Sequence, residues 1–495
     1  MKFQIQDSKK KPIADGLVLA YFSKEKPSDH TWFKILLKSD QKQVAKLFSA
    51  KEFSGQEKQQ AVVHSLRSGK IILIGLGDKS KWQERRLVLV ARQIIQVAKQ
   101  AKVKSLALNI DNLSASLISS EKLSQLVVEN MIMADYTFNV YKEKKDNIFS
   151  IQKVLLGINK LALQPSVQGV KTGEVVGSFV NYARDLGNTP GGDMTPELLA
   201  QKAKAVGKEN KVKVTVLNKQ QIKANKMGAI LGVAKGSSED PRFIIMEYWG
   251  AGKKDQPYVF VGKGVTFDSG GLNLKPTSGM DDMWMDMLGG AAVISAIGAI
   301  AKLKLPVNVV GLIPSVENML SSSSYRPGDL LRGMSGKSIE ILNTDAEGRV
   351  ILSDALTYAE KFNPKLVVDV ATLTGSCVVA LGLRMSGLFT VDEKIQSDLY
   401  NVGLTSGDYV WPMPMWEEYE DDIKGTFGDV QNAGKQRYGD AISGAMFLYQ
   451  FAKKYPWAHL DIAGPMKAVD GQFLAKGASG VGVRFLIELI KSKIK

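Results

Sequence analysis

The chain repeats one pattern along most of its length: a short apolar run typical of a β-strand, followed by a segment with apolar residues at helical spacing. The strand-like runs are GLVLAYF (16–22), KIILIGLG (70–77), SLALNI (105–110), KVTVL (213–217), RFIIMEY (242–248), PYVFVGKG (257–264), VNVVGLI (307–313), KLVVDVATLTG (365–375) and HLDIAG (459–464). Helical spacing is clearest at 84–102, 173–190, 286–303 and 346–361. Alternating strands and helices build a parallel or mixed sheet with helices on its faces. We therefore predict an α/β protein.

The length of 495 residues exceeds what one domain of ordinary size holds. We predict two domains: a smaller N-terminal α/β domain over 1–160, and a large C-terminal α/β domain over 185–495 with a central mixed sheet flanked by helices. Residues 161–184 are expected to form a helical linker region. The charged run KEKKDN (142–147) is expected in an exposed loop. We find no apolar leader and no 18-residue apolar run, which predicts a cytoplasmic protein with no membrane contact.

The positive charge of the chain is concentrated in its first third. The net charge is +15, and residues 1–170 carry 28 Lys and Arg against 15 Asp and Glu. We expect a lysine-rich, solvated surface. The alternative is a basic face that attracts DNA, because a clustered positive charge draws in nucleic acid.

Several classes of chemistry are excluded by what the sequence lacks. The only cysteine is Cys377, and the only histidines are His30, His64 and His459. A disulfide framework and a histidine-rich or thiolate metal site are therefore excluded, so that a bound metal would need mainly oxygen ligands. Cys377 and His459 lie in apolar runs and are expected in the core. GMSGKS (333–338) lacks the first glycine of a phosphate loop, and no serine nucleophile elbow occurs.

Two polar segments follow strand-like runs and carry most of the candidate chemistry. They are VGKGVTFDSGGLNLKPTSGMDDMWMDM (261–287) and NTDAEGRV (343–350), which follows IEIL (339–342). Ligands of open α/β sheets bind beyond the carboxyl ends of the strands, where these segments begin. Four clustered carboxylates repel one another unless a cation compensates, and a pair of divalent metals does so in many hydrolases. The candidate residues are Lys263, Asp268, Lys275, Asp286, Asp345, Glu347 and Arg349.

The spacing within these segments is consistent with such a site. Asp345 and Glu347 are two residues apart, so in extended backbone both side chains point to the same side. Gly270, Gly271 and Gly348 permit a positive φ or a close approach of other groups. The alternative for a single carboxylate is helix capping, as Asp345 could cap a helix that starts near Ala346.

On these motifs the sequence resembles the leucine aminopeptidase family, the dinuclear M17 metallopeptidases that include bacterial aminopeptidase A. NTDAEGR (343–349) stands unaltered as the family signature, and the spacing from Lys263 to Asp286 agrees with the family pattern. WAHLDIAG (457–464) and GASGVGVRFL (477–486) also match. NTPGGDMTP (188–196) has Gly192 where Asn is more usual, and DVQNAGKQRYGDAISGAMFL (429–448) is a looser match. The first 165 residues show only general resemblance.

The resemblance implies a leucyl aminopeptidase, which removes an apolar, leucine-like N-terminal residue from peptides. It implies two divalent metal ions per subunit, Mn or Zn, with Mg or Co as alternatives. Asp268 and Glu347 would bridge both ions, Lys263 and Asp286 would complete one site, and Asp345 the other. A hydroxide that bridges the metals would attack the scissile carbonyl. Lys275 would stabilise the oxyanion, and Arg349 would hold bicarbonate as the general base.

The resemblance also implies a pocket for the N-terminal side chain, and an assembly. Asn343 would contact the substrate, and the pocket would be lined by Met283, Thr372, Gly375, Ala463 and Met466. The assembly would be a homohexamer in the cytoplasm. Two alternatives remain: a protein that additionally binds DNA in recombination or transcription, and an inactive scaffold, which is disfavoured because all seven candidate residues of the metal-site segments are present.

Overall fold

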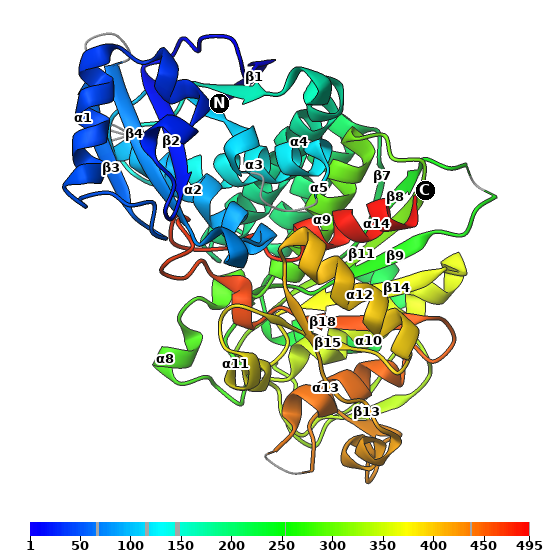
Figure 1. The fold of residues 1–495 in the computed structure, drawn as a ribbon. Coiled ribbons are helices and arrows are strands. Elements are labelled where there is room, and N and C mark those ends of the chain that lie inside the picture. The colour runs from blue at the N-terminus through cyan, green and yellow to red at the C-terminus, as the bar shows by residue number, and fades with distance from the viewer. Residues whose placement is uncertain (66–68, 114–117, 144–148, 253, 436–437, 495) are drawn as a thin grey trace. The chain divides into compact units, whose positions relative to one another are not determined.

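The structure is a computed structural model, which describes all residues except 66–68, 114–117, 144–148, 253, 436–437 and 495. It contains two compact units (Figure 1). Unit 1 comprises Met1–Asn181 and Val469–Ala475, and unit 2 comprises Tyr182–Ala468 and Lys476–Lys495. Both units are α/β, as predicted. Residues 163–184 lie in helix α4 (Leu163–Asn188), and the units divide within this helix. Most of the predicted loop at 142–147 lies outside the described residues.

Unit 1 is built on a six-stranded sheet with the order β1-β6-β5-β2-β4-β3. All neighbours are parallel except β3 and β4. The two edge strands, β1 and β3, are mostly exposed or half-buried, which explains why their apolar pattern was too weak to predict them. The strands are β1 (Lys2–Asp7), β2 (Gly16–Phe22), β3 (Gln60–Ser65), β4 (Gly69–Gly77), β5 (Ser105–Asn109) and β6 (Lys153–Ile158).

Helices cover both faces of this sheet. Helices α2 (Glu84–Gln100) and α3 (Ser120–Asp135) pack on one face, and α1 (Lys38–Ser49) packs on the other. Alternate residues of β2 enter the two cores, so that Val18 faces α2 while Leu19 faces α1. A strand buried on both faces reads as a continuous apolar run, which is how β2 and β4 were predicted.

A short segment from late in the sequence also belongs to unit 1. Val469–Ala475 lies against α2, where Arg92 Nη1 donates to the carbonyl of Gln472 and Gln96 Nε2 donates to the carbonyl of Phe473, both at 3.4 Å. Phe473 has a φ of +54°, a conformation that bulky residues rarely adopt. The segment is therefore held in one defined conformation by the unit that precedes it by almost 300 residues in the sequence.

Unit 2 is built on a nine-stranded mixed sheet with the order β16-β15-β18-β14-β9-β11-β8-β7, in which β10 also pairs with β11. The central strands β18, β14, β9 and β11 are parallel, while β15, β8 and β7 are antiparallel to a neighbour. The strands are β7 (Lys213–Leu217), β8 (Arg242–Trp249), β9 (Tyr258–Gly262), β10 (Gly264–Asp268), β11 (Asn308–Asn318), β14 (Leu366–Ala371), β15 (Ser386–Phe389), β16 (Val410–Pro412) and β18 (Trp457–Asp461). A small sheet of β12 (Leu330–Arg332), β13 (Ser338–Glu340) and β17 (Val430–Gln431) completes the unit.

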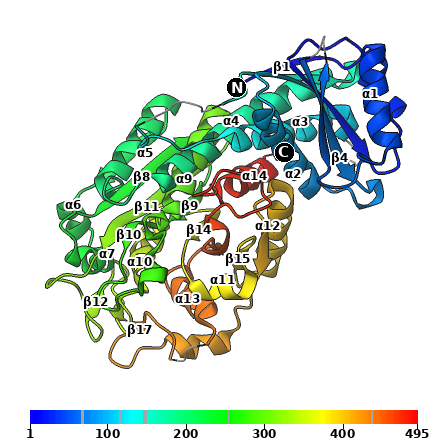
Figure 2. The same cartoon turned by 90° about the vertical axis from the view of Figure 1, so that its left-hand side faces the viewer.

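Two layers of helices cover the large sheet (Figure 2). One layer contains α5 (Pro196–Asn210), α9 (Leu288–Lys302) and α14 (Val483–Lys493), and the other contains α7 (Gly228–Val233), α10 (Glu347–Ala359) and α13 (Asp440–Tyr449). Against our expectation, the stretch Thr277–Lys302, which includes α9, is long and apolar enough to cross a membrane. However, 89% of its most apolar 18-residue window is buried inside the protein, as in a core helix.

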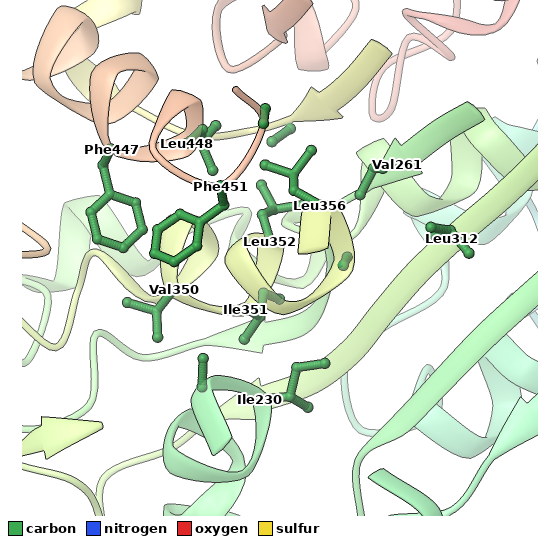
Figure 3. Close-up of a cluster of buried hydrophobic side chains, with 14 of the residues drawn as sticks. Ile230, Val261, Leu312, Val350, Ile351, Leu352, Leu356, Phe447, Leu448 and Phe451 are labelled. Atoms are coloured by element: carbon green, nitrogen blue, oxygen red, sulfur yellow. The ribbon is translucent and has the colours of Figure 1, made fainter. Parts of the chain in front are cut away.

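Helix α10 lies at the centre of a hydrophobic cluster that fixes its position (Figure 3). Its apolar side chains pack between α7, the sheet and α13. The residues labelled in the cluster are Ile230, Val261, Leu312, Val350, Ile351, Leu352, Leu356, Phe447, Leu448 and Phe451. Burial of side chains of this size contributes about 1.5–3 kcal/mol each, so the first turn of α10 is firmly anchored.

Candidate metal centre

Lys263 lies where β9 ends and β10 begins, at the carboxyl end of the central strands. Its amide donates to the carbonyl of Val370 at 3.0 Å, and its own carbonyl accepts from Gly290 at 2.7 Å. The side chain is only 3% exposed, and Nζ lies 2.8 Å from Asp286 Oδ2 and 2.8 Å from Glu347 Oε1. The predicted strand over 257–264 is thus two strands, with the lysine at their junction.

Three buried carboxylates surround this ammonium group. Asp268 ends β10, Asp286 precedes α9, and Glu347 is the first residue of α10. One oxygen from each lies within 4.8 Å of the others. The ends of one strand and two helices therefore bring together side chains that are up to 79 positions apart in the sequence, from Asp268 to Glu347.

Asp345 joins this group through the turn before α10, and not through the extended backbone that we expected. Asn343 Oδ1 accepts from the amide of Asp345 at 2.9 Å, which closes a turn of the kind that asparagine favours. Ala346 is the N-cap of α10, and no side chain caps the helix. The alternative in which Asp345 caps this helix is therefore wrong: its carboxylate contacts Lys275 instead.

Lys275 bridges a second pair of carboxylates. Its Nζ lies 2.8 Å from Asp268 Oδ2 and 2.5 Å from Asp345 Oδ1. Its side chain is 15% exposed, five times as much as that of Lys263. Gly270 and Gly271 have φ values of +85° and +65°, so they let the loop after β10 reverse and return Lys275 to the strand end, as predicted.

Gly348 makes room for the buried lysine. A Cβ atom at this position would lie 2.7 Å from Lys263 Cε and 2.8 Å from its Nζ. These distances are too short for non-bonded atoms, so the predicted close approach at Gly348 is confirmed. A larger residue in the first turn of α10 would displace Lys263 from Asp286 and Glu347.

The charges of the site strongly affect one another. Burial raises the pKa of Asp268 and of Asp286, and the nearby Glu347 raises both further. Burial and Asp268 raise the pKa of Asp345 to about 7. Burial also opposes ionisation of Glu347, but Lys263 and Lys275 outweigh it and lower the pKa. Likewise burial disfavours the ammonium forms of both lysines, but the surrounding carboxylates prevail and raise the pKa of each.

The oxygen atoms of this site suit a divalent cation. Among the described residues, four buried carboxylate oxygens meet no hydrogen-bond donor: Asp286 Oδ2, Asp345 Oδ1 and both Glu347 Oε atoms. Lysine ammonium groups contact three of them as ion pairs, without hydrogen-bond geometry. Two lysines offset only half of the charge of four carboxylates, and hard cations prefer such oxygen ligands. The donor set therefore fits a metal centre, which we define as Lys263, Asp268, Asp286, Asp345 and Glu347.

Polar residues that the sequence analysis did not select hold the metal centre in place. Asn318 ends β11, and its Nδ2 donates to Asp268 Oδ1 at 2.8 Å and to the carbonyl of Thr344 at 3.0 Å. The Thr344 hydroxyl donates to the carbonyl of Gly270 at 2.6 Å, and Tyr325 donates to the carbonyl of Thr344 at 2.7 Å. Asn318 follows an apolar strand, so the rule that selected Asp268 could have found it. Tyr325 lies in an irregular segment and gave no such signal.

The predicted pocket residues lie on three segments at the same end of the sheet. Met283 lies on a short 3-10 helix (Met283–Met285), Thr372 and Gly375 follow β14, and Ala463 and Met466 follow β18. The Thr372 hydroxyl donates to Asp286 Oδ1 at 2.7 Å, so this residue also orients a carboxylate of the metal centre. Gly375 is exposed at the start of α11 (Gly375–Leu381), and Met283, Ala463 and Met466 are half-buried.

Two contacts tie the pocket segments together. Asp461 accepts from the amides of Leu373 and Ala463 at 3.2 and 3.1 Å and from the Thr374 hydroxyl at 2.6 Å. Asp282 and Lys467 form an ion pair, and each is adjacent in sequence to one of the two pocket methionines. The pocket segments are therefore fixed relative to one another by buried and half-buried polar groups.

The histidine and the cysteine of the apolar runs lie in the core, as expected. Cys377 is fully buried, and burial and then Asp461 raise its thiol pKa to about 12, so it is a poor nucleophile. His459 is fully buried, and its Nδ1 lies 2.5 Å from Asp369 Oδ1. Asp369 also accepts from Trp457 Nε1 at 2.7 Å. This pair stabilises the packing of β14 on β18.

Arg349 lies in the first turn of α10, two residues after Glu347, and its guanidinium contacts Asn432 and Asp440. The side chain is 3% exposed, Nη1 donates to the carbonyl of Asn432 at 3.0 Å, and Nη2 donates to Asp440 Oδ1 at 3.0 Å. A Cβ atom on Gly444 of α13 would lie 3.2 Å from Nη2, so this helix packs directly on the guanidinium. The third guanidinium nitrogen, Nε, is buried and meets no hydrogen-bond partner among the described residues. The contact of Arg349 with bicarbonate therefore stays a prediction.

Comparisons with known proteins agree across both units. Residues 181–487 match the model of the cytosol aminopeptidase family, catalytic domain, and residues 18–145 match the model of its N-terminal domain. A probable cytosol aminopeptidase of Syntrophotalea carbinolica is 40% identical over 451 residues, which cover 90% of each chain. One of Aromatoleum aromaticum is 46% identical over 370 residues, 75% of this chain and 73% of the relative. The solved structure of the bottromycin maturation enzyme BotP in complex with Mn has a TM-score of 0.86 at 28% identity, and covers 97% of this chain and 100% of that one.

Proposed function

The chain belongs to the cytosol aminopeptidase family, and from this premise we propose how its residues perform the hydrolysis of an N-terminal peptide bond. Membership makes the protein a metal-dependent aminopeptidase, which is a hydrolase. The observation that carries the proposal is the group of four carboxylates and two lysines at the carboxyl ends of the central strands. Among the described residues, three of its buried oxygens are contacted only by the lysines, and Glu347 Oε2 meets no hydrogen-bond donor. We propose that this group holds two divalent metal ions.

In this proposal Asp268 and Glu347 would hold both ions, Lys263 and Asp286 would complete one site, and Asp345 the other. The Lys263 ammonium would lose its proton when a metal ion binds, because only the neutral amine has a lone pair to donate and a nearby dication disfavours the charged form. When bound, a metal pair lowers the pKa of water and polarises the scissile carbonyl. Mn and Zn are the proposed metals, with Mg and Co as alternatives; the BotP structure holds Mn.

Lys275 is placed to stabilise the negative charge that develops on the carbonyl oxygen of the substrate. Its pKa is raised by the three carboxylates around it, which outweigh burial, so it keeps a fixed positive charge. It is also the more exposed of the two lysines. A preorganised charge of this kind stabilises the transition state more than the substrate.

Met283, Ala463 and Met466, with Thr372 and Gly375, would receive an apolar, leucine-like side chain. Methionine side chains are flexible and polarizable, so they accommodate apolar groups of different shapes. Asn343 has its side-chain oxygen in the turn before Asp345. Its Nδ2 group would donate in the proposed contact with the substrate.

The proposed setting of the enzyme is the cytoplasm, as part of a homohexamer that acts on peptides. The names of the curated relatives, cytosol aminopeptidases, support the location. DNA binding as a second function has no support in the comparisons.

Removal of the metal tests the metal centre. A chelator should abolish hydrolysis of leucine amide and lower the melting temperature together, because a ligand that binds only the native state stabilises it. Adding back each metal in turn should restore both. Asp268→Asn should lose metal as measured by elemental analysis, whereas Asp281→Asn, an exposed residue of the same segment, should retain it. Full activity in protein verified as metal-free would contradict the proposal.

A further inference from the structure

The side chain of Asn432 is fully buried and binds the main chain just before the metal-centre residue Asp345. Its Oδ1 accepts from the amides of Leu342 and Asn343 at 2.8 and 3.2 Å. Its Nδ2 donates to the carbonyl of Asn343 at 2.6 Å. One side chain therefore makes three hydrogen bonds to the main chain of two consecutive residues.

The segment that carries Asn432 is itself held in place. It follows β17, which pairs in parallel with β13, and the amide of Asn432 donates to the carbonyl of Glu340 at 2.9 Å. Glu340 Oε2 accepts from the amides of Thr426 and Phe427 at 2.7 and 3.0 Å, and the carbonyl of Asn432 accepts from Arg349 Nη1 at 3.0 Å. On the side of this segment all these contacts use main-chain atoms, so they remain when the Asn432 side chain is replaced.

The turn that carries Asp345 is anchored on two sides. Asn343 Oδ1 accepts from the amide of Asp345 at 2.9 Å and closes the turn. The carbonyl of Thr344 accepts from Asn318 Nδ2 at 3.0 Å, whereas Asn432 binds both the amide and the carbonyl of Asn343. The orientation of the Asp345 carboxylate therefore depends in part on Asn432.

Glu347 depends less on this turn. It is the first residue of α10, and the hydrophobic cluster that includes Val350 and Ile351 anchors that helix. Loosening of the turn should therefore move Asp345 and leave Glu347 in place.

We infer that Asn432 is a positioning residue that sets the affinity for the metal ion held by Asp345, acting through Asn343. The inference rests on the proposed function, because it concerns one of the two proposed metal sites. Groups that orient a metal ligand typically contribute about 10–100-fold in metal affinity. Since Thr344 keeps its own hydrogen bonds, we expect the lower end of this range.

The experiment measures the metal affinity of the full-chain holoenzyme with Mn²⁺ as the probe. The protein is dialysed against buffers of decreasing free Mn²⁺, and the ions per chain are counted by elemental analysis. Asn432→Ala removes all three hydrogen bonds, and Asn432→Ser keeps a hydroxyl that is too short to replace them all. Melting temperatures establish that each variant is folded.

Asn308→Ala is the matched control. Asn308 is 1% exposed and lies at the start of β11, at the opposite end of this strand from Asn318. Its side chain also makes three hydrogen bonds to the main chain: it accepts from Ala251 at 3.0 Å and donates to the carbonyls of Gly252 and Asp255 at 2.5 and 2.7 Å. None of these partners belongs to the metal centre, so the replacement should lower the melting temperature without changing Mn²⁺ binding.

Wild type and Asn308→Ala should lose their two ions at the same concentrations of free Mn²⁺. In Asn432→Ala one of the two ions should be lost at about 10-fold higher free Mn²⁺ while the other is unchanged, and Asn432→Ser should show a smaller shift of the same ion. Hydrolysis of leucine amide by both Asn432 variants should fall when Mn²⁺ is limiting and return to near the wild-type kcat in excess Mn²⁺. A merely structural asparagine would give no selective loss of one ion.

The inference is overturned if the folded Asn432 variants hold both ions as wild type does, or if Asn308→Ala weakens Mn²⁺ binding equally. It is also overturned if neither Asn432 variant folds, since the side chain then supports the fold as a whole. Failure of the proposed function is a different result: wild type itself would then not bind a pair of Mn²⁺ ions, or would hydrolyse leucine amide at the same rate without them.

Discussion

Lys263 and Lys275 make nearly the same contacts, since each ammonium group lies 2.5–2.8 Å from two carboxylates. Their surroundings nevertheless differ. Lys263 is enclosed by Gly348 and the carbonyl of Thr372, to which it donates at 2.9 Å, while Lys275 is partly open to solvent. A buried nitrogen can act only on the metal centre, whereas a partly exposed one can also reach a substrate.

The two lysines should therefore respond differently to substitution. We expect Lys263→Ala to lower metal occupancy, because it removes a ligand and the group that fills the space beside Gly348. Lys275→Ala should keep near-normal occupancy but lower kcat by about 10²–10³-fold, the usual loss for one oxyanion donor. Elemental analysis and steady-state kinetics measure the two effects.

Lys254→Ala, an exposed lysine of the same unit, should change neither quantity. Equal metal loss in both site variants would show that the roles have been assigned wrongly. Unchanged kcat in Lys275→Ala would show the same for the oxyanion role.

At the residue scale, most of the metal centre could be predicted, because polar residues that directly follow apolar strands are visible in the sequence. Asp268 and Lys263 were found in this way. The contact of Arg349 with Asp440 could not be predicted, because only the fold brings the start of α13 to the start of α10. The reason given for Asp345 and Glu347 was also wrong, since a turn and not an extended strand joins them.

At the scale of elements, α10 is connected to its neighbours by a buried carboxylate as well as by apolar packing. Asp354 is fully buried, and accepts from the amide of Ile230 in the first turns of α7 at 3.0 Å and from Met334 at 2.7 Å. The first amides of a helix have no partner within the helix, so Asp354 supplies one. Burial outweighs these hydrogen bonds and raises the pKa of Asp354 to about 7.

This shift predicts a pH dependence of stability. Native Asp354 keeps its proton up to about pH 7, whereas in the unfolded chain it releases it near its ordinary pKa of 3.8. Between these values the native state binds more protons, so the contribution of Asp354 is full below about pH 4 and is lost as the pH rises to 7. Between pH 5 and pH 8 the free energy of unfolding of wild type should fall by on the order of 1–3 kcal/mol relative to that of Asp354→Asn.

Urea denaturation at the two pH values measures this difference. Asp255→Asn, an exposed carboxylate of the same unit, should follow wild type at both. If the free energies of unfolding of wild type and Asp354→Asn change equally with pH, the pKa of Asp354 is not raised.

The elements themselves were predicted where their apolar signal is strong. The strands β2, β4, β5, β7, β8, β9, β11, β14 and β18 and the helices α2, α9 and α10 fall close to their expected ranges. Very short elements were missed, such as β12 and β17 of the small sheet, because two or three residues leave no periodicity to detect. Their pairing depends on contacts between distant parts of the chain.

At the scale of the whole molecule, the excess of positive charge in residues 1–170 is either a solvated surface or a face that binds DNA. We expect it to be a solvated surface, because lysines such as Lys9, Lys10 and Lys11 are exposed. Reversing these three to glutamate should leave peptidase activity unchanged, and duplex DNA should not bind the wild type at physiological salt. A gel shift measures binding. In the predicted loop at 142–147, Lys142 is also exposed, and the lysines at 144 and 145 lie outside the described residues.

DNA binding that is lost on charge reversal while peptidase activity persists would contradict this expectation. The logarithm of the DNA-binding constant would fall linearly with the logarithm of the salt concentration, with a slope of about −0.9 per neutralised phosphate. Charge reversal is the better test than deletion of residues 1–160, because unit 1 also contains Val469–Ala475 and its removal would leave that segment without α2.

That late segment also bears on the order in which the protein is made. Translation proceeds from the N-terminus, so residues 1–181 leave the ribosome long before Val469–Ala475. The carbonyls of Gln472 and Phe473 that accept from α2 arrive only when nearly all of unit 2 has been synthesised. A nascent N-terminal fragment therefore lacks these two contacts until the last tenth of the chain has been translated, even where its sheet and helices have already formed.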